Sequence, residues 1–390
     1  MVYAGLLLFL VPLVVSLMVT WLARRAALRL GLMDAPGHRK VHEVATPRNG
    51  GIGIFWGIAV PVLAGVGVIS LVPAATLGGM LPEFAREKLL SQLPGMMLHR
   101  PLALLVVGTT LAIHLLGLLD DRKTRTGGLA PWPKLLCQFA AAGALLGIGE
   151  MIERGGFRTL TALDGAFPGG FLVSCLATVV WIVALTNAFN FLDNMDGLSA
   201  GVAFIAGLMF FIAAYLGGQW FVCGLLVVFM GSTLGFLCYN FPPASIFMGD
   251  GGSMVLGFFL SALTIRTTYY HQGGGAGGGV EGTRWWALFM PLVVLAVPLY
   301  DLVIVSVLRL ARGRSPMTGD TNHFSHRLVR HGFSKRGAVL VIYALTFAVG
   351  ISAPLLSRAE SSLEAALVGL QVLAMLVVIG ILERVGEHTT

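Results

Sequence analysis

Four side chains that can bind a cation follow an apolar segment in the middle of this chain. Asn187, Asn190, Asp193 and Asp196 come directly after the apolar run 171–185. On a helix, residues three apart share a face, so Asn187 and Asn190, and likewise Asp193 and Asp196, can act together. Their oxygens are the ligands that a hard cation such as Mg²⁺ prefers. The alternative is a polar loop between two membrane spans.

A second acidic pair ends another apolar segment. Asp120 and Asp121 are adjacent, and they repel each other unless a cation, basic groups or water stand nearby. Arg122 and Lys123 provide a purely structural neutralisation as the alternative. Lys134 begins the next apolar run, where it either anchors the helix at the membrane interface or contacts a phosphate.

A glycine-rich turn surrounds one more carboxylate. Gly249, Gly251 and Gly252 flank Asp250, and a helix is expected to begin at about Ser253. The N–H groups at such a helix start can bind an anion, and Asp250 would then be a metal ligand beside it. Alternatively, Asp250 and Ser253 only cap the helix.

An aromatic residue precedes this turn. Phe247 is either a stacking platform for a base or an interfacial aromatic side chain.

Two basic segments, one near each end of the chain, contain the remaining candidate functional residues. The segment 309–336 contains His323, His326 and Arg327, and a basic, glycine-ended segment contains Thr46 and Arg48. Arginines and a charge-tuned histidine can bind a diphosphate, although a basic loop ordinarily only sets membrane topology. Zinc is disfavoured because no cysteine lies near the histidines.

The composition shows what kind of protein must position these residues. The chain has 390 residues, of which 56% are hydrophobic and 12% charged, and its mean hydropathy is +0.84. Such values predict an all-α, polytopic membrane bundle forming a single domain over 1–390. The first apolar run is expected to be a retained span. The four cysteines have no CxxC spacing, and the chain has no nucleic-acid-binding module.

Eleven membrane spans are expected from the apolar runs. Their predicted ranges are 3–22, 51–70, 101–119, 133–149, 170–187, 198–216, 220–238, 253–269, 286–308, 337–356 and 363–383. With the N-terminus outside and the C-terminus inside, most Lys and Arg residues lie on the inner face, as the positive-inside rule requires. The loops bearing the chemistry then share that face: 23–50, 120–134, 187–197, 239–253 and 309–336. Residues 71–101 and the glycine-rich stretch 271–282 are expected to be external and without chemistry.

Five motifs occur in one order on the predicted inner face. They are Thr-Pro-Arg-Asn-Gly-Gly at 46–51, Asp-Asp at 120–121, the acidic and amide cluster at 187–197, Gly-Asp-Gly-Gly-Ser at 249–253, and Asp-x-x-His-x-x-His-Arg-Leu at 320–328. This order resembles the polyprenyl-phosphate N-acetylhexosamine-1-phosphate transferases, over roughly residues 35–335.

The resemblance implies a reaction and its setting. Enzymes of this family transfer a phospho-sugar from a UDP-N-acetylhexosamine to undecaprenyl or another polyprenyl phosphate, using Mg²⁺, for which Mn²⁺ can substitute. UMP is released. The resemblance also implies a bacterial cytoplasmic membrane, an active site facing the cytoplasm, a step early in cell-envelope polysaccharide synthesis, and a homodimer.

The histidine motif separates two branches of the family. The branch using UDP-muramoyl-pentapeptide normally has three successive histidines, whereas the branch using UDP-N-acetylglucosamine or a related sugar has His-x-His-His-Arg-Leu. His323-Phe-Ser-His326-Arg-Leu is closer to the second form, although Ser325 replaces its middle histidine. Transfer of N-acetylglucosamine 1-phosphate is therefore expected, with the pentapeptide branch as the alternative.

The resemblance further implies the roles of individual residues. Asp250 is expected to be the principal Mg²⁺ ligand, with Asp121 or Asp193 contributing, and Asp120 a base or positioning group for the lipid phosphate. The remaining residues are expected to bind substrate: Asn187 and Asn190 at the nucleotide or metal waters, Asp196 and Phe247 at the uridine, His323, His326 and Arg327 at the diphosphate, Lys134 at the lipid phosphate, and Thr46 and Arg48 within the first motif.

Two alternatives remain open from the sequence. A cation-coupled transporter would also carry membrane carboxylates, but here most of them lie at span ends beside basic loops and not at mid-span. Within the enzyme class, a direct in-line attack is favoured over a two-step path through an aspartyl intermediate on Asp120 or Asp193.

Overall fold

The computed structural model describes most of the chain, and its elements are nearly all helical. The described residues are 2–30, 33–34, 45–79, 83–123, 128–153, 157–160, 163–164, 167–269, 285–315, 317, 322–356, 359 and 361–384. In chain order the elements are α1 (Val2–Leu30), β1 (Met33–Asp34), β2 (Thr46–Pro47), α2 (Gly51–Leu71), α3 (Ala74–Gly79), α4 (Glu83–Lys123), α5 (Pro131–Glu153), α6 (Gly170–Leu192), α7 (Leu198–Leu216), α8 (Trp220–Asn240), α9 (Asp250–Tyr269), η4 (Trp285–Phe289), α10 (Met290–Val294), α11 (Ala296–Ala311), α12 (Phe324–Arg330), α13 (Lys335–Gly350), α14 (Ala353–Leu356) and α15 (Ser362–Arg384).

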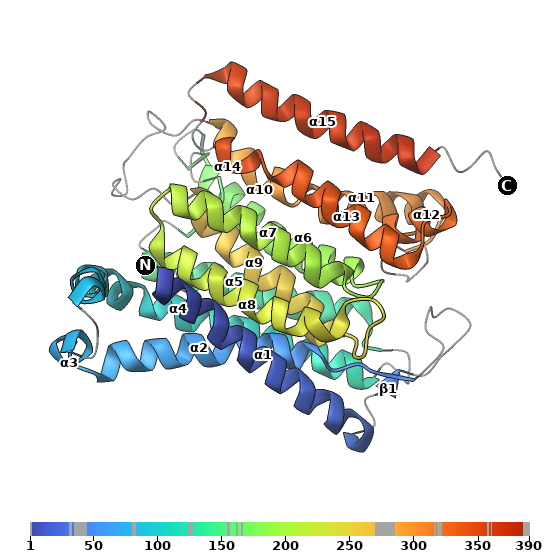
Figure 1. The fold of residues 1–390 in the computed structure, drawn as a ribbon. Helices are drawn as coiled ribbons and strands as arrows, with labels where there is room; N and C mark the ends of the chain where they lie inside the picture. The colour runs from blue at the N-terminus through green and yellow to red at the C-terminus, as the bar shows by residue number, and fades with distance from the viewer. Residues whose placement is uncertain are drawn as a thin grey trace.

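The long helices form one bundle, with α15 along one edge and α1 and α2 toward the opposite edge (Figure 1). Within the described residues, nine helices are long and apolar enough to cross a membrane. The prediction of an all-α, polytopic bundle is therefore confirmed. The assignment of the two ends to the outside and the inside stays a prediction.

Two of the eleven expected spans differ from simple apolar helices. The expected span 286–308 is divided into η4, α10 and α11, with Leu295 between the last two. Pro298 lacks the N–H that would bond to the carbonyl of residue 294, so a continuous helix is disfavoured there. The expected span 253–269 is α9, which begins with polar and glycine residues, carries Arg266 and is not among the nine.

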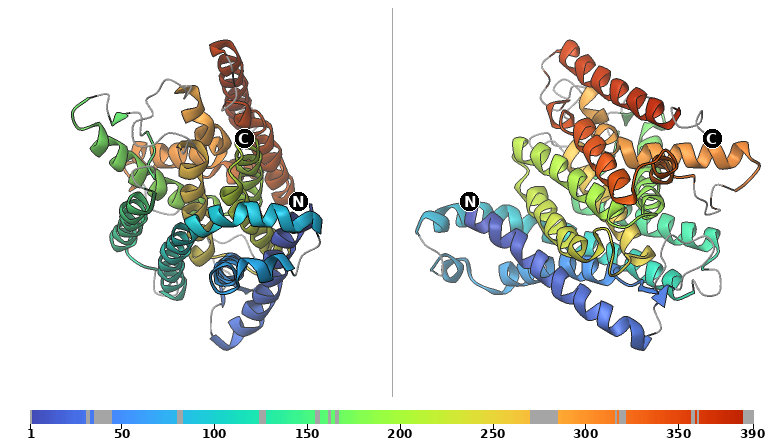
Figure 2. Two further views of the ribbon diagram at one scale, coloured as in Figure 1. Left: turned by 90° about the vertical axis from the view of Figure 1, so that its left-hand side faces the viewer. Right: turned by 45° about the vertical axis from the view of Figure 1, so that its right-hand side comes forward.

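The prediction of an external loop or amphipathic segment at 71–101 is only partly correct. The segment contains α3 and the first part of α4, which is 41 residues long and contains Pro94 and Pro101. α4 changes direction along its length (Figure 2), as expected where proline removes a helical hydrogen bond. The glycine-rich stretch 271–282 lies outside the described residues.

α9 lies inside the bundle, packed against α2, α4, α6 and α7 (Figures 1 and 2). Residues 250–267 are all buried. Glycines permit this close packing: a Cβ atom at Gly117 of α4 or at Gly257 of α9 would collide with the backbone of the neighbouring helix. The start of α9 is thereby held against the last turns of α4.

Candidate active site

Asp121 fixes the start of α9. Its two carboxylate oxygens accept the backbone N–H groups of Asp250 and Gly251, each at 2.9 Å. The turn before the helix requires Gly249, whose φ is +71° and whose Cβ would collide with the Asp121 carboxylate. A carboxylate that accepts two helix-start N–H groups is a helix cap. The Asp120–Asp121 and Gly249–Ser253 motifs are therefore one structural unit.

Three carboxylates share two cations at this point. Arg48 Nε lies 3.1 Å from Asp121 Oδ1, and Arg48 Nη2 lies 3.3 Å from Asp250 Oδ1. Lys134 Nζ contacts Asp250 Oδ2 and lies 3.1 Å from Asp120 Oδ2. Mutual repulsion of the acidic groups is thus offset by basic side chains from two other motifs.

The segment after β2 lies directly against the start of α9. Gly50 N–H donates to the Phe247 carbonyl and Gly51 N–H to the Met248 carbonyl, each at 2.9 Å, and Phe247 N–H donates to the Pro47 carbonyl at 2.8 Å. A Cβ at Gly51 would collide with the backbone of α9. These bonds hold the segment containing Thr46 and Arg48 beside the acidic residues.

Asn187 and Asn190 lie in the last turns of α6, which continues to Leu192 beyond the predicted span end at 187. Asn190 Nδ2 donates to Ser253 Oγ of α9 at 2.9 Å, and Asn187 Nδ2 donates to Gln138 Oε1 of α5 at 2.6 Å. The two amides share a helix face, as their spacing predicts. They bind other helices here, so a role toward nucleotide or metal waters stays a prediction.

Asp193 and Asp196 differ in their surroundings. Asp196 Oδ2 accepts the backbone N–H of Ala244 at 2.9 Å, so it ties the α6–α7 turn to the segment before α9. Asp193 directly follows α6, and burial raises its pKa to about 8. The Arg48 guanidinium opposes this rise, while the neighbouring carboxylates of Asp250, Asp121 and Asp196 add to it. Asp193 therefore belongs electrostatically to the acidic cluster.

The histidine motif lies beside the α6–α7 turn. Ser325 Oγ donates to Asn194 Oδ1 at 2.5 Å, which joins the start of α12 to that turn. The ring centroids of His323 and His326 are 6.3 Å apart, and Arg327 donates to the Asn322 carbonyl. Asp320 lies outside the described residues. The first, second, third and fourth motifs are joined by direct contacts, and the fifth is joined through Asn194.

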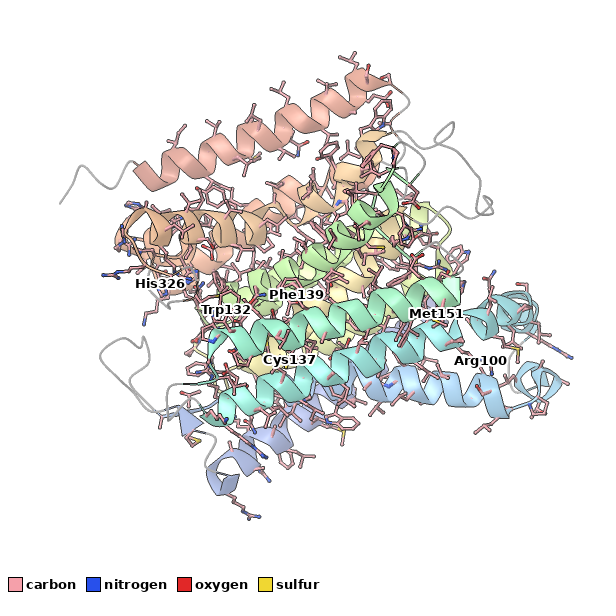
Figure 3. The ribbon with its side chains drawn as sticks, turned by 180° about the vertical axis from the view of Figure 1, so that it is seen from behind. Arg100, Trp132, Cys137, Phe139, Met151 and His326 are labelled. Atoms are coloured by element: carbon pink, nitrogen blue, oxygen red, sulfur yellow. The ribbon has the colours of Figure 1, made fainter. Side chains whose placement is uncertain are left out.

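One end of the bundle carries these motifs. His326 and Trp132 lie toward one end of the helices, and Met151 and Arg100 toward the other (Figure 3). Trp132, two residues before Lys134, is 81% exposed. An exposed indole next to the acidic cluster is typical of a side chain at the membrane interface.

Two residues of this region were not singled out from the sequence. His114 of α4 is buried, lies 2.7 Å from the Gly251 carbonyl through Nδ1 and stacks on Phe55. A histidine within an apolar span is a signal that could have identified it. Asn240 accepts from Gly197 N–H and donates to the Ile246 carbonyl, both at 2.9 Å, and no pattern marks it.

The acidic cluster does not form an all-protein metal cage. Within the described ranges, no group of three or more His, Cys, Asp or Glu side chains is arranged to hold a metal ion. Asp121 already accepts two backbone N–H groups. Mg²⁺, however, is usually held by one or two carboxylates together with water and substrate phosphates. Asp250, with Asp121 or Asp193 contributing, fits this kind of site, because Oδ2 of Asp121, which accepts the Gly251 N–H, still has a second lone pair.

Comparison with known proteins places this chain in a family. The family model described as glycosyl transferase family 4 matches residues 103–268, from α4 to α9. A protein of Bacillus subtilis (strain 168), named probable undecaprenyl-phosphate N-acetylglucosaminyl 1-phosphate transferase, is 31% identical over 380 residues, which are 97% of this chain and 92% of the relative. The chain belongs to glycosyl transferase family 4. It is accordingly a phosphosugar transferase enzyme and a multi-pass membrane protein.

Other relatives distinguish the branches of family 4. The decaprenyl-phosphate N-acetylglucosaminephosphotransferase of Mycobacterium tuberculosis (strain H37Rv) is 35% identical over 347 residues, covering 85% of this chain and 77% of the relative. A phospho-N-acetylmuramoyl-pentapeptide-transferase of Desulforudis audaxviator is 33% identical over 273 residues, covering 66% of this chain and 74% of the relative. The muramoyl-pentapeptide transferase thus matches a smaller share of this chain than the N-acetylglucosamine phosphate transferases do.

Proposed function

We propose that this enzyme transfers N-acetylglucosamine 1-phosphate from UDP-N-acetylglucosamine to a polyprenyl phosphate such as undecaprenyl phosphate. The observation that carries the proposal is the match over 97% of the chain to a relative named for this transfer. The cluster of Asp120, Asp250, Lys134 and Arg48 at one end of the helices supports it, because a lipid phosphate would lie at that depth. The products are polyprenyl-diphosphate N-acetylglucosamine and UMP.

The chemistry is a single in-line displacement in this proposal. An oxygen of the lipid phosphate attacks the sugar-bearing phosphorus, and the bond from that phosphorus to the UMP oxygen breaks. Phosphoryl transfer depends on alignment and on charge neutralisation. A bound Mg²⁺, for which Mn²⁺ could substitute, would supply positive charge beside the diphosphate. Asp250, with Asp121 or Asp193 contributing, would hold it.

The basic side chains would bind the phosphates. Lys134 would bind the lipid phosphate, where its ammonium group already lies between Asp120 and Asp250. His323, His326 and Arg327 would bind the diphosphate of the nucleotide. Asp120 would orient the attacking phosphate, and a strong base is not needed because the second pKa of a phosphate monoester is about 6.

The remaining predicted contacts belong to the nucleotide. Phe247 and Asp196 would flank the uridine, and Asn187 and Asn190 would orient the nucleotide. Cytoplasmic exposure of the site, a bacterial inner membrane and a homodimer are further parts of the proposal. The bacterial relatives support a bacterial membrane, and the excess of Lys and Arg in the loops that carry the motifs supports the cytoplasmic side.

The test is an assay of purified, folded protein with undecaprenyl phosphate, UDP-N-acetylglucosamine and Mg²⁺, measuring UMP release and the lipid product. We expect turnover that is abolished by EDTA, restored by Mg²⁺ and lost in Asp250→Asn. The matched control is Glu153→Gln, which alters another buried ion-paired carboxylate, bonded to Arg266 at the C-terminal end of α9.

Two outcomes would contradict the proposal. Turnover only with UDP-muramoyl-pentapeptide would assign the enzyme to the other branch of family 4. Failure to release UMP from any nucleotide sugar tried, in protein shown to be folded, would exclude the proposed reaction.

A further inference from the structure

Asp301 and His323 form a buried pair outside the acidic cluster. Asp301 Oδ2 lies 2.7 Å from His323 Nδ1, and Asp301 Oδ1 accepts the backbone N–H of Phe324 at 2.7 Å. Asp301 is 1% exposed and His323 is 6% exposed. A backbone N–H only donates, and an ionised carboxylate only accepts. The geometry therefore places a histidine proton on Nδ1, directed at Asp301.

The other edge of the imidazole faces Arg309. Arg309 Nη2 lies 3.5 Å from His323 Nε2, and the guanidinium carbon lies 4.9 Å from the centroid of the Phe191 ring. Asp301, Val305 and Arg309 are spaced by four residues on the buried face of α11. One helix face thus carries both the carboxylate on one edge of the imidazole and the guanidinium on the other.

We propose that Asp301 is a positioning residue, an inference that rests on the proposed transfer reaction. It fixes the imidazole of His323 so that Nε2 and the Arg309 guanidinium form one binding edge for a substrate phosphate. An imidazolium donates from Nε2, and its charge is stabilised by the Asp301 carboxylate. Arg309 donates to the same phosphate group. Arg309 is thereby added to the substrate-binding residues.

The first test is a double-mutant cycle in the full-length protein, using the assay described above. Asp301→Asn keeps the size and the acceptor for Phe324 N–H, but its amide donates to Nδ1 and drives the proton to Nε2. We expect Asp301→Asn and His323→Gln each to lower kcat about 10–100-fold, as removing an orienting partner of a histidine commonly does. The double variant should be no slower than His323→Gln alone, because Asp301 acts through His323.

Glu153→Gln is the control for a general loss of packing. Glu153 lies in another buried ion pair, with Arg266, at the opposite end of α9 from Asp250. The purified, folded Glu153→Gln protein should keep kcat within about twofold of the wild type, because substitutions at distant sites with no shared partners do not couple.

Arg309→Gln identifies the phosphate that is bound. The KM should rise for the substrate that carries this phosphate, either UDP-N-acetylglucosamine or undecaprenyl phosphate.

The second test reads the protonation of His323 in the wild-type protein directly. In wild-type protein labelled with ¹⁵N-histidine, the signals of His323, identified by their absence in His323→Gln, should show a protonated Nδ1 at a pH where the imidazole is neutral. This tautomer tests the hydrogen bond to Asp301 itself, and the double-mutant cycle separates a positioning role from a merely structural one. In Asp301→Asn the proton should move to Nε2.

Clear results would overturn the inference. These are an Nε2-protonated, Nδ1-free His323 in the wild type, wild-type kcat in Asp301→Asn, or effects of the two substitutions that multiply in the double variant. Wild-type turnover is measured first, so failure of the transfer reaction itself is distinguished from failure of the role of Asp301.

Discussion

Lys134 joins two carboxylates that face each other across the start of α9. Replacing it by methionine keeps the length of the side chain but leaves Asp120 and Asp250 without their shared cation. Removing one partner from a buried ion pair costs about 3–5 kcal/mol, and the cost here should fall below that range because Lys134 is only partly buried. We expect Lys134→Met to lower the melting temperature, and to lower kcat/KM for undecaprenyl phosphate about 100-fold, as loss of one charge-stabilising donor does.

Lys335, which begins α13, supplies the matched control for this prediction. Lys335→Met should leave the melting temperature and the kcat/KM for the lipid near the wild-type values. An unchanged kcat/KM in Lys134→Met would show that Lys134 does not bind the lipid phosphate.

Asp121 is predicted to act through the backbone of α9. Asp121→Ala removes the acceptor of two buried N–H groups, whereas Asp121→Asn keeps one carbonyl oxygen for them. Loss of a helix cap costs about 0.5–2 kcal/mol. The melting temperature should therefore fall in the order wild type, Asn, Ala. Equal melting temperatures for the three proteins would contradict a capping role.

At the residue scale, the sequence predicted polar side chains that do lie together at one end of the bundle, but not how they pair with one another. The carboxylates of Asp120, Asp121 and Asp250 and the basic Lys134 were identified because polar groups are costly in so apolar a chain. Their pairing depends on where α4, α5 and α9 meet, and that is a tertiary property. Asn240 illustrates the limit, because a lone asparagine at a helix end gives no signal of its two loop contacts.

Helix packing makes a prediction at the scale of the element. A Cβ at Gly117 of α4 would collide with the backbone of Asp250 and Gly251, whereas a Cβ at Gly108, in the same helix, meets nothing within 4 Å. We expect Gly117→Ala to lower the free energy of unfolding by about 1–3 kcal/mol, as overpacking does. It should also reduce kcat, because the start of α9 must move.

Gly108→Ala is the control and should be neutral or slightly stabilising, because alanine is the better helix former. Thermal unfolding and UMP release measure both variants. Similar behaviour of the two alanine variants would show that close packing of α4 on α9 is not required.

Apolar periodicity predicted most elements, and its failures have physical causes. The expected span 286–308 is broken because Pro298 has no N–H to donate, so the hydropathy of this apolar run alone does not predict the break. The segment 71–101 was expected to be an external loop or amphipathic segment, and its second half is part of the long helix α4, which contains Pro94 and Pro101. Local sequence predicts the polarity of a segment, but the length of a helix also depends on packing against neighbouring helices.

The outer faces of the bundle make a prediction for the whole molecule. Leu373, at the centre of α15, is 58% exposed, in accordance with a surface that faces lipid. A lysine at the centre of a membrane helix costs about 2.5–3.5 kcal/mol on insertion scales. We expect Leu373→Lys to reduce the amount of protein in the membrane fraction, whereas Leu373→Phe should not. Equal amounts of both variants would show that this face does not contact lipid.

The burial of α9 has a consequence for how the chain is made. Arg266, near the end of this helix, is paired with Glu153 of α5, and α9 lacks the composition of an independent span. Its principal neighbours, α2, α4, α6 and α7, as well as α5, all precede it in the chain. These partners, including Glu153, which pairs with Arg266, are therefore synthesised before α9 is. The order of synthesis thus allows α9 to pack against helices that have already been made.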